Sequence, residues 1–150
     1  MAAIKAVALA LIGVEAALTE ADTKVGDGDC GTTHTRGAQA LADDVAYYPL
    51  DEHPAALALA LGHSVRRSMG GTSGALYDIF FAAAAAAMKG AEGEAEAAPG
   101  DWLAGFIAGT EAVKQYGGAV AGNRTMLVGR IHDARHGMFC ICFNLLLIGP

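Results

Sequence analysis

Apolar residues recur every three or four positions along most of the chain, which is the spacing of helices that bury one face. The first stripe, which predicts a single helix over residues 2–21, consists of Ile4, Val7, Leu11, Val14 and Leu18. Similar stripes between Gly, Pro and Asp residues predict further helices over 32–47, 54–69, 72–87 and 101–116. No segment alternates apolar and polar residues with the period of two that is typical of a half-buried strand. The pattern therefore predicts an all-α fold.

Composition narrows the class of protein further. The chain has 150 residues, of which 53% are hydrophobic and 7% aromatic, as expected for one domain of closely packed, Ala-rich helices. Its net charge of −6, with Arg66–Arg67 as the only clustered basic pair, argues against a nucleic-acid partner, which requires a positive face. The three cysteines, Cys30, Cys140 and Cys142, form no disulfide or zinc spacing. We therefore expect a reducing compartment, the cytoplasm.

Two apolar segments bear on membrane association. The run Ala6–Val14 resembles a short signal-peptide core, but the helical stripe that continues past it favours a buried first helix. The segment Met138–Ile148 is shorter than the ~20 residues that span a bilayer. We expect no transmembrane helix and no membrane partner.

An acidic loop carries the clearest chemical signal. Asp22, Asp27 and Asp29 lie within eight residues, with Gly26, Gly28 and Gly31 between and after them. Their carboxylates repel one another, and a hard divalent cation such as Mg²⁺ would neutralise them next to phosphate oxygens. The alternative is an Asp/Gly-rich turn whose carboxylates cap the helix that follows.

Two glycine-rich segments are candidate contacts for a phosphorylated ligand. The segment Gly70–Gly74 precedes a helix and contains Thr72 and Ser73, so its backbone N–H groups and hydroxyls form a candidate anion pocket, or else an ordinary helix cap. Further along, Arg124 and Thr125 follow the pair Gly117–Gly118, and they suit a nucleotide's edge or phosphate, or else form a plain turn.

Together these segments resemble a known family. The runs Leu18–His34, Met69–Tyr77 and Gly122–Leu127 are similar, in order and spacing, to the nucleotide-binding L domain of dihydroxyacetone (glycerone) kinases. The resemblance covers residues 1–127, which we interpret as a partial L-type domain. The form with Cys30 after the third Asp and Thr-Thr-His next is most similar to the ATP-dependent, single-chain kinases.

The resemblance implies a fold, a reaction and a site. The fold is an antiparallel helical barrel or bundle, truncated here to about five or six helices. The reaction is phosphoryl transfer from ATP to a small keto-triose held by a separate K domain. This reaction needs positioning and charge neutralisation rather than a nucleophilic side chain, so no catalytic residue is assigned. Asp22, Asp27 and Asp29 would hold two Mg²⁺ ions. The nucleotide contacts implied are Asp27, Gly28, Asp29, Cys30, Thr72, Ser73, Gly117, Thr125 and Met126.

The resemblance ends after Leu127. Residues 128–150 lack the Asp-rich helix, the Gly-Arg-Ala-Ser-type loop and the Asp-Pro-Gly turn with which the family closes over its nucleotide. We therefore interpret these residues as a divergent tail, and we interpret the chain as a truncated or alternatively spliced product. We accordingly expect weak nucleotide affinity, self-association through an open barrel edge and no turnover by this chain alone. The alternatives are a catalytically incomplete nucleotide-binding or regulatory module, or a plain helical interaction domain.

Overall fold

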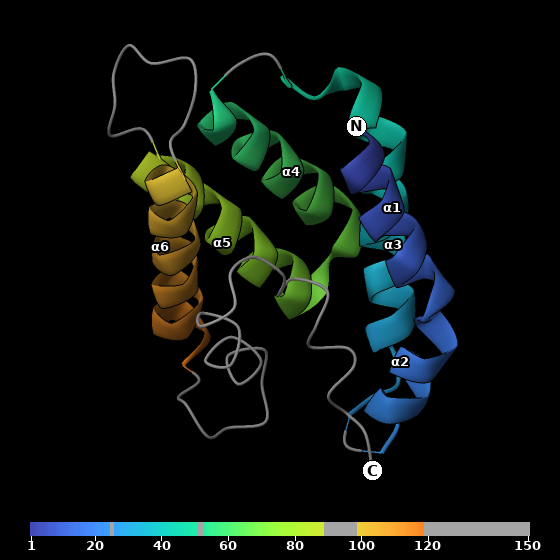
Figure 1. Cartoon of the computed structure of the whole chain (residues 1–150). Helices are drawn as coiled ribbons and strands as arrows, with labels where there is room; N and C mark the ends of the chain where they lie inside the picture. The colour runs from blue at the N-terminus through green and yellow to red at the C-terminus, as the bar shows by residue number, and fades with distance from the viewer. Residues whose placement is uncertain (25, 51–52, 89–98, 119–150) are drawn as a thin grey trace.

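The structure is a computed structural model that describes residues 1–24, 26–50, 53–88 and 99–118. Within these ranges the backbone forms six α-helices, one short 3-10 helix and no strand (Figure 1). The elements are α1 (Ala2–Gly13), α2 (Glu15–Asp22), α3 (Cys30–Asp44), η1 (Val45–Tyr47), α4 (Pro54–Met69), α5 (Gly71–Met88) and α6 (Pro99–Gly117). The all-α prediction is confirmed.

From α2 onward, consecutive helices pack on one another, and α1 packs mainly on α3. Helices α1 and α2 both lie against α3, α3 packs on α4, α4 on α5, and α5 on α6 (Figure 1). Helices α4 and α5 are separated by Gly70 alone, so the chain turns back sharply between them. This order of packing leaves α1 with α2 at one side of the described part and α6 at the other.

The core is built from small side chains. One buried cluster lies between α4 and α5 and contains Ala55, Ala58, Ala84, Ala85 and Met88. A second cluster joins α1 to α3 through Ala8, Leu11 and Ala38. Alanine is the best helix former and lets helix axes approach closely, so the Ala-rich composition serves both helix formation and packing.

The prediction of one helix over residues 2–21 is wrong, because the chain bends at Val14. Helices α1 and α2 meet there at 51°, and the N–H of Val14 donates to the carbonyl of Leu11, 3.3 Å away, in a tighter turn. The bend follows Gly13, a poor helix former. It directs α2 onto α3, where Leu18 is only 2% exposed. Tertiary packing therefore overrides a continuous apolar stripe.

The other helix boundaries differ from the predictions by a few residues. Pro54 begins α4 as predicted, and the ring of His53 accepts a hydrogen bond from Ala55 N, 3.2 Å away. Helix α5 begins at Gly71, so Thr72 and Ser73 lie inside its first turn and do not cap it. The Gly-, Glu- and Ala-rich stretch 89–100 predicts a solvated linker, but its last two residues, Pro99 and Gly100, already belong to α6. The rest of that stretch lies outside the described residues, as does the predicted tail, 128–150.

A polar network joins the end of α3 to α4. The buried hydroxyl of Tyr48 donates to Ser64 Oγ (2.9 Å), and Ser64 Oγ donates to Asp44 Oδ2 (2.5 Å). Arg67 donates to the same carboxylate oxygen at 2.7 Å. The network satisfies the buried oxygens of Tyr48 and Ser64, and it fixes α4 against the segment that leads into it.

Among the helices that the structure describes, none alone has both the length and the apolar character needed to cross a membrane. Helices α1 and α2 reach that length and composition only when taken together, across their bend.

Candidate functional site

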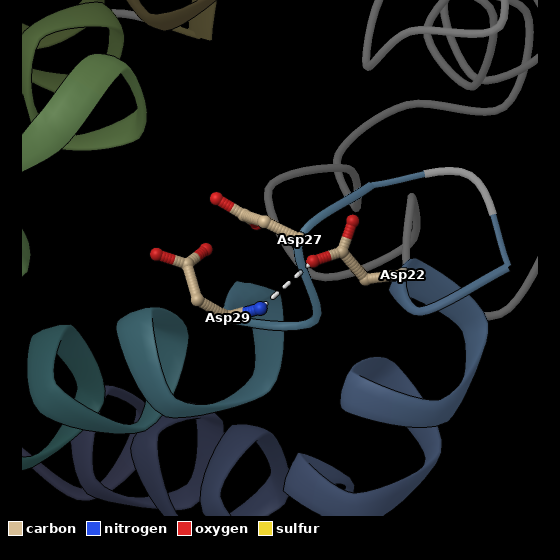
Figure 2. Close-up of side chains that lie close together, drawn as sticks. All are labelled: Asp22, Asp27 and Asp29. Atoms are coloured by element: carbon tan, nitrogen blue, oxygen red, sulfur yellow. Dashed lines mark hydrogen bonds between the residues drawn. The ribbon is translucent and has the colours of Figure 1, made fainter.

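The acidic loop brings its three carboxylates together. Asp22 is the last residue of α2, Asp29 immediately precedes α3, and Asp27 lies in the loop between them. One oxygen from each carboxylate lies within 4.8 Å of the other two. Figure 2 shows Asp22 reaching across from α2 while Asp27 and Asp29 project from the loop to one side. The three candidate metal ligands thus form one cluster, as a shared cation requires.

Asp22 also has a structural role. Its Oδ2 accepts hydrogen bonds from the backbone N–H groups of Asp29 (3.0 Å) and Cys30 (3.1 Å), so it caps α3 from the preceding helix (Figure 2). Its carbonyl accepts from Gly26 N at 2.6 Å, and a Cβ on Gly26 would collide with its carboxylate. The capping alternative is therefore correct for Asp22.

Capping does not explain the other two aspartates. Asp29 occupies the N-cap position of α3, yet its side chain makes no capping hydrogen bond. Both Asp27 and Asp29 are exposed. Two solvated carboxylates beside a third, in a loop that Asp22 already holds, are available to a ligand from solution.

The thiol of Cys30 reports the negative potential at this loop. Partial burial is the largest cause that raises its pKa, and the carboxylates of Asp22, Asp29 and Asp27 raise it further. Cys30 is therefore held as a neutral thiol, which is a poor nucleophile. The same potential would repel a polyphosphate unless a cation neutralised it first.

The start of α5 provides open backbone rather than charge. Gly70 and Gly71 both adopt positive φ, at 69° and 56°, which favours glycine. A Cβ at either position would meet no atom of the described residues within 4 Å, so none of them fills the space in front of this turn. The first N–H groups of a helix lack acceptors within it, and here they are accompanied by the exposed Thr72 and the half-buried Ser73.

Contacts connect this turn to the acidic loop and to the end of α6. Nε2 of His34, in the second turn of α3, lies 3.3 Å from the hydroxyl oxygen of Tyr77 on α5. A Cβ on Gly117, the last residue of α6, would lie 3.4 Å from the side chain of Leu76. In Figure 1 the starts of α3 and α5 and the end of α6 all lie toward the lower end of the molecule.

Of the predicted nucleotide contacts, those in the described ranges lie on these three segments. Gly28 and Cys30 belong to the acidic loop and the start of α3, Thr72 and Ser73 to α5, and Gly117 to α6. Thr125 and Met126 lie outside the described residues, as does Arg124. The pair His34–Tyr77 was not predicted, because 43 residues separate its members and no local pattern signals the contact.

Comparison with known proteins places the chain in a family. Residues 24–130 match the DAK2 domain, so the chain belongs to the DAK2 domain family. It is 46% identical over 126 residues to a putative 3,4-dihydroxy-2-butanone kinase of Solanum lycopersicum, covering 83% of this chain and 21% of that protein. It is 43% identical over 117 residues to a triokinase/FMN cyclase of Homo sapiens, and this match covers 78% of this chain and 20% of that protein.

A solved structure agrees with the fold. The dihydroxyacetone kinase from C. freundii, in complex with AMP-PNP and Mg²⁺, superposes with a TM-score of 0.73 and 33% identity over 84% of this chain and 22% of that chain. The all-helical fold and the resemblance to dihydroxyacetone kinases are confirmed. The chain spans about a fifth of the length of these three proteins.

Proposed function

We propose that this chain is the ATP- and Mg²⁺-binding domain of a dihydroxyacetone (glycerone) kinase. In this proposal the γ-phosphoryl group of ATP passes to a small keto-triose that a separate K domain presents. The clustering of Asp22, Asp27 and Asp29 carries the proposal, since three carboxylates that converge in one loop suit a metal–polyphosphate complex. A related kinase structure contains AMP-PNP and Mg²⁺, which supports the same ligands here.

The residues of the acidic loop fit magnesium. Mg²⁺ prefers carboxylate oxygens, water and phosphate oxygens, and Asp27 and Asp29 offer solvated carboxylates next to the fixed carboxylate of Asp22. When bound, the metal would neutralise the loop and the charge that develops on the transferred phosphoryl group. The loop itself positions these oxygens, because Asp22 ties the start of α3 to the end of α2.

The start of α5 is proposed to bind the phosphate groups. The N–H groups of its first turn and the hydroxyls of Thr72 and Ser73 are donors, and the positive end of the helix dipole favours an anion. Gly117 at the end of α6, with Thr125 and Met126, is proposed to contact the nucleoside. Catalysis then requires no nucleophile from this chain, in keeping with its neutral Cys30 thiol.

Thermal unfolding tests the metal requirement. Mg·ADP at a hundredfold excess over its dissociation constant is expected to raise the unfolding temperature by roughly 5–10 °C. The nucleotide with a chelator should give no shift, since three carboxylates then repel its phosphates. Equal shifts with and without the chelator would contradict the metal assignment.

Single-atom replacements test the ligands. Asp27→Asn and Asp29→Asn each remove one negative charge while keeping the shape of the side chain, and each should remove most of the Mg·ADP shift without unfolding the protein. Asp43→Asn is the matched control, because Asp43 is an exposed aspartate on α3 that pairs with Gln39 at 2.9 Å. A variant of Asp27 or Asp29 that fails to fold would instead support the structural alternative for that residue.

Turnover separates the kinase from the alternative, a non-catalytic nucleotide-binding or regulatory module. We expect phosphorylation of dihydroxyacetone only after a dihydroxyacetone-binding K domain is added to the chain. Nucleotide binding without turnover in that mixture would favour the regulatory module. The absence of Mg-dependent binding would leave a helical interaction domain.

A further inference from the structure

His34 makes hydrogen bonds at both ends of its ring. Its Nδ1 lies 2.8 Å from the carbonyl oxygen of Cys30, and its Nε2 lies 3.3 Å from the hydroxyl of Tyr77. The rings of His34 and Tyr77 meet edge to face, with centroids 5.9 Å apart. His34 therefore contacts both the residue that follows the acidic loop and the second turn of α5.

The two partners determine where the ring carries its proton. A carbonyl oxygen only accepts hydrogen bonds, so Nδ1 carries the proton and donates it to Cys30. Nε2 of the neutral ring is then an acceptor, and the Tyr77 hydroxyl donates to it. One neutral tautomer satisfies both bonds. In the other, Nδ1 could accept from the Cys30 thiol, whose sulfur lies 3.5 Å away, but it would direct its lone pair at the carbonyl oxygen, which is nearer at 2.8 Å.

A second link holds the same two regions together. Arg36, two residues further along α3, donates to the carbonyl oxygen of Met69 at 3.1 Å. A Cβ on Gly37 would lie 2.7 Å from the side chain of Met69, so α3 and the end of α4 are in close contact. Helix α3 thus holds the Gly70–Gly71 turn on both sides, at Met69 before it and at Tyr77 after it.

We infer that His34 is a positioning residue, which sets the acidic loop relative to the start of α5 by holding Cys30 and Tyr77 at once. The inference rests on the proposed function, because the spacing matters to a ligand only if a metal–nucleotide complex contacts both segments. A link that fixes two ligand-binding segments before the ligand arrives reduces the ordering that binding must otherwise impose. Nucleotide affinity in the presence of Mg²⁺ should therefore depend on both bonds of His34.

Three variants separate the two bonds. His34→Asn keeps a donor close to the position of Nδ1 but loses the acceptor for the Tyr77 hydroxyl. His34→Gln reaches toward Tyr77 but loses the donor to the Cys30 carbonyl oxygen. Tyr77→Phe keeps the ring and removes the hydroxyl. Each variant should weaken Mg·ADP binding, measured by titration calorimetry, by about fivefold, the size expected for one net hydrogen bond. His63→Asn and Tyr47→Phe, at exposed positions, are the matched controls.

A double variant and a spectroscopic measurement distinguish positioning from general stability. Because His34 and Tyr77 act through each other, the variant that combines His34→Asn with Tyr77→Phe should bind no more weakly than either single variant. The ¹⁵N spectrum of the ligand-free protein should show the His34 ring protonated at Nδ1. In Tyr77→Phe the ring should shift toward a mixture of tautomers.

Several results would overturn the inference. Wild-type affinity in all three variants, with or without a lower unfolding temperature, would reduce His34 to a structural residue. A wild-type ring protonated at Nε2 would contradict the assigned bonds. If the wild-type chain itself does not bind Mg·ADP, the proposed function fails and the inference fails with it, which is a different result from binding that the variants leave unchanged.

Discussion

Gly31 shows how closely a single residue controls the acidic loop. A Cβ at this position would collide with the backbone carbonyl of Glu15 and the hydroxyl of Thr19, both on α2. Backbone atoms yield less easily than side chains, so Gly31→Ala should lower the free energy of unfolding by about 3 kcal/mol. It should also weaken Mg·ADP binding, because α2 carries Asp22, which caps α3.

The control for this substitution lies in α1. A Cβ on Gly13 would meet no atom of the described residues within 4 Å, so Gly13→Ala should leave stability unchanged or raise it by about 0.5–1 kcal/mol through reduced freedom of the unfolded chain. Urea unfolding of the two variants at pH 7 provides the comparison. Equal effects would show that α2 does not pack on Gly31 as described.

The raised pKa of Tyr48 predicts that the protein loses stability at alkaline pH. Burial is the largest cause that raises its pKa above the ordinary value of 10.0, and the Asp44 carboxylate raises it further. The unfolded chain then loses this proton first, so the stability contributed is present below pH 10 and is lost as pH rises through the folded-state pKa. We expect the free energy of unfolding to fall above pH 10, and to fall less steeply in Tyr48→Phe.

The same variant tests the hydrogen bond of Tyr48 at neutral pH. Removing the donor to Ser64 should cost about 1 kcal/mol at pH 7. Tyr47→Phe is the control, because Tyr47 is 85% exposed and its hydroxyl should affect neither neutral stability nor the alkaline slope. An alkaline slope that stays unchanged in Tyr48→Phe would assign it to other groups.

Among the helices, the contact between α5 and α6 depends on glycine. A Cβ on Gly109 would lie 2.7–2.8 Å from the ring and the carbonyl oxygen of Phe80, and one on Gly105 would press on Met88. Gly109→Ala should therefore destabilise the protein by about 2–3 kcal/mol. At Gly100, on the same helix, a Cβ would meet none of the described residues within 4 Å, so Gly100→Ala should be neutral or slightly stabilising. Calorimetric unfolding of both variants checks the difference.

The helices were predictable from the sequence because their stripes and end signals are local. The periodic spacing in α4, together with Pro54 and Gly70, marks its two ends without reference to any other helix. The periodic pattern does not predict the bend at Val14, because the apolar stripe continues across it from α1 to Leu18 on α2. The sequence pattern could suggest that three aspartates share a cation, but not that Asp22 also caps α3 from seven residues upstream. Nor could it pair His34 with Tyr77, which requires the packing of α3 near α5.

At the scale of the whole molecule, the proposed function requires the acidic loop and the start of α5 to act together. The chain carries a net charge of −6, and three of its carboxylates converge in the acidic loop that is proposed to hold the metal. In the proposed function a metal ion would supply positive charge at this site, because the basic side chains of the described residues nearby already have partners: Lys24 pairs with Glu20, and Arg36 donates to Thr33 and to the carbonyl oxygen of Met69. Binding of nucleotide is thus expected to be conditional on the cation.

The outer side of α6 leads to a last prediction. Among the described elements α6 packs chiefly on α5, and Leu103 and Ile107 on its other side are 57% and 52% exposed, with Trp102 nearby. Exposed apolar residues one helical turn apart favour contact with a second apolar surface, and we expect the isolated chain to self-associate through this face. Ile107→Glu should shift sedimentation velocity profiles toward monomer at equal concentration. Leu9→Glu on α1, also exposed, is the control and should leave association unchanged. A wild-type chain that sediments as a monomer across the concentration range would contradict the prediction.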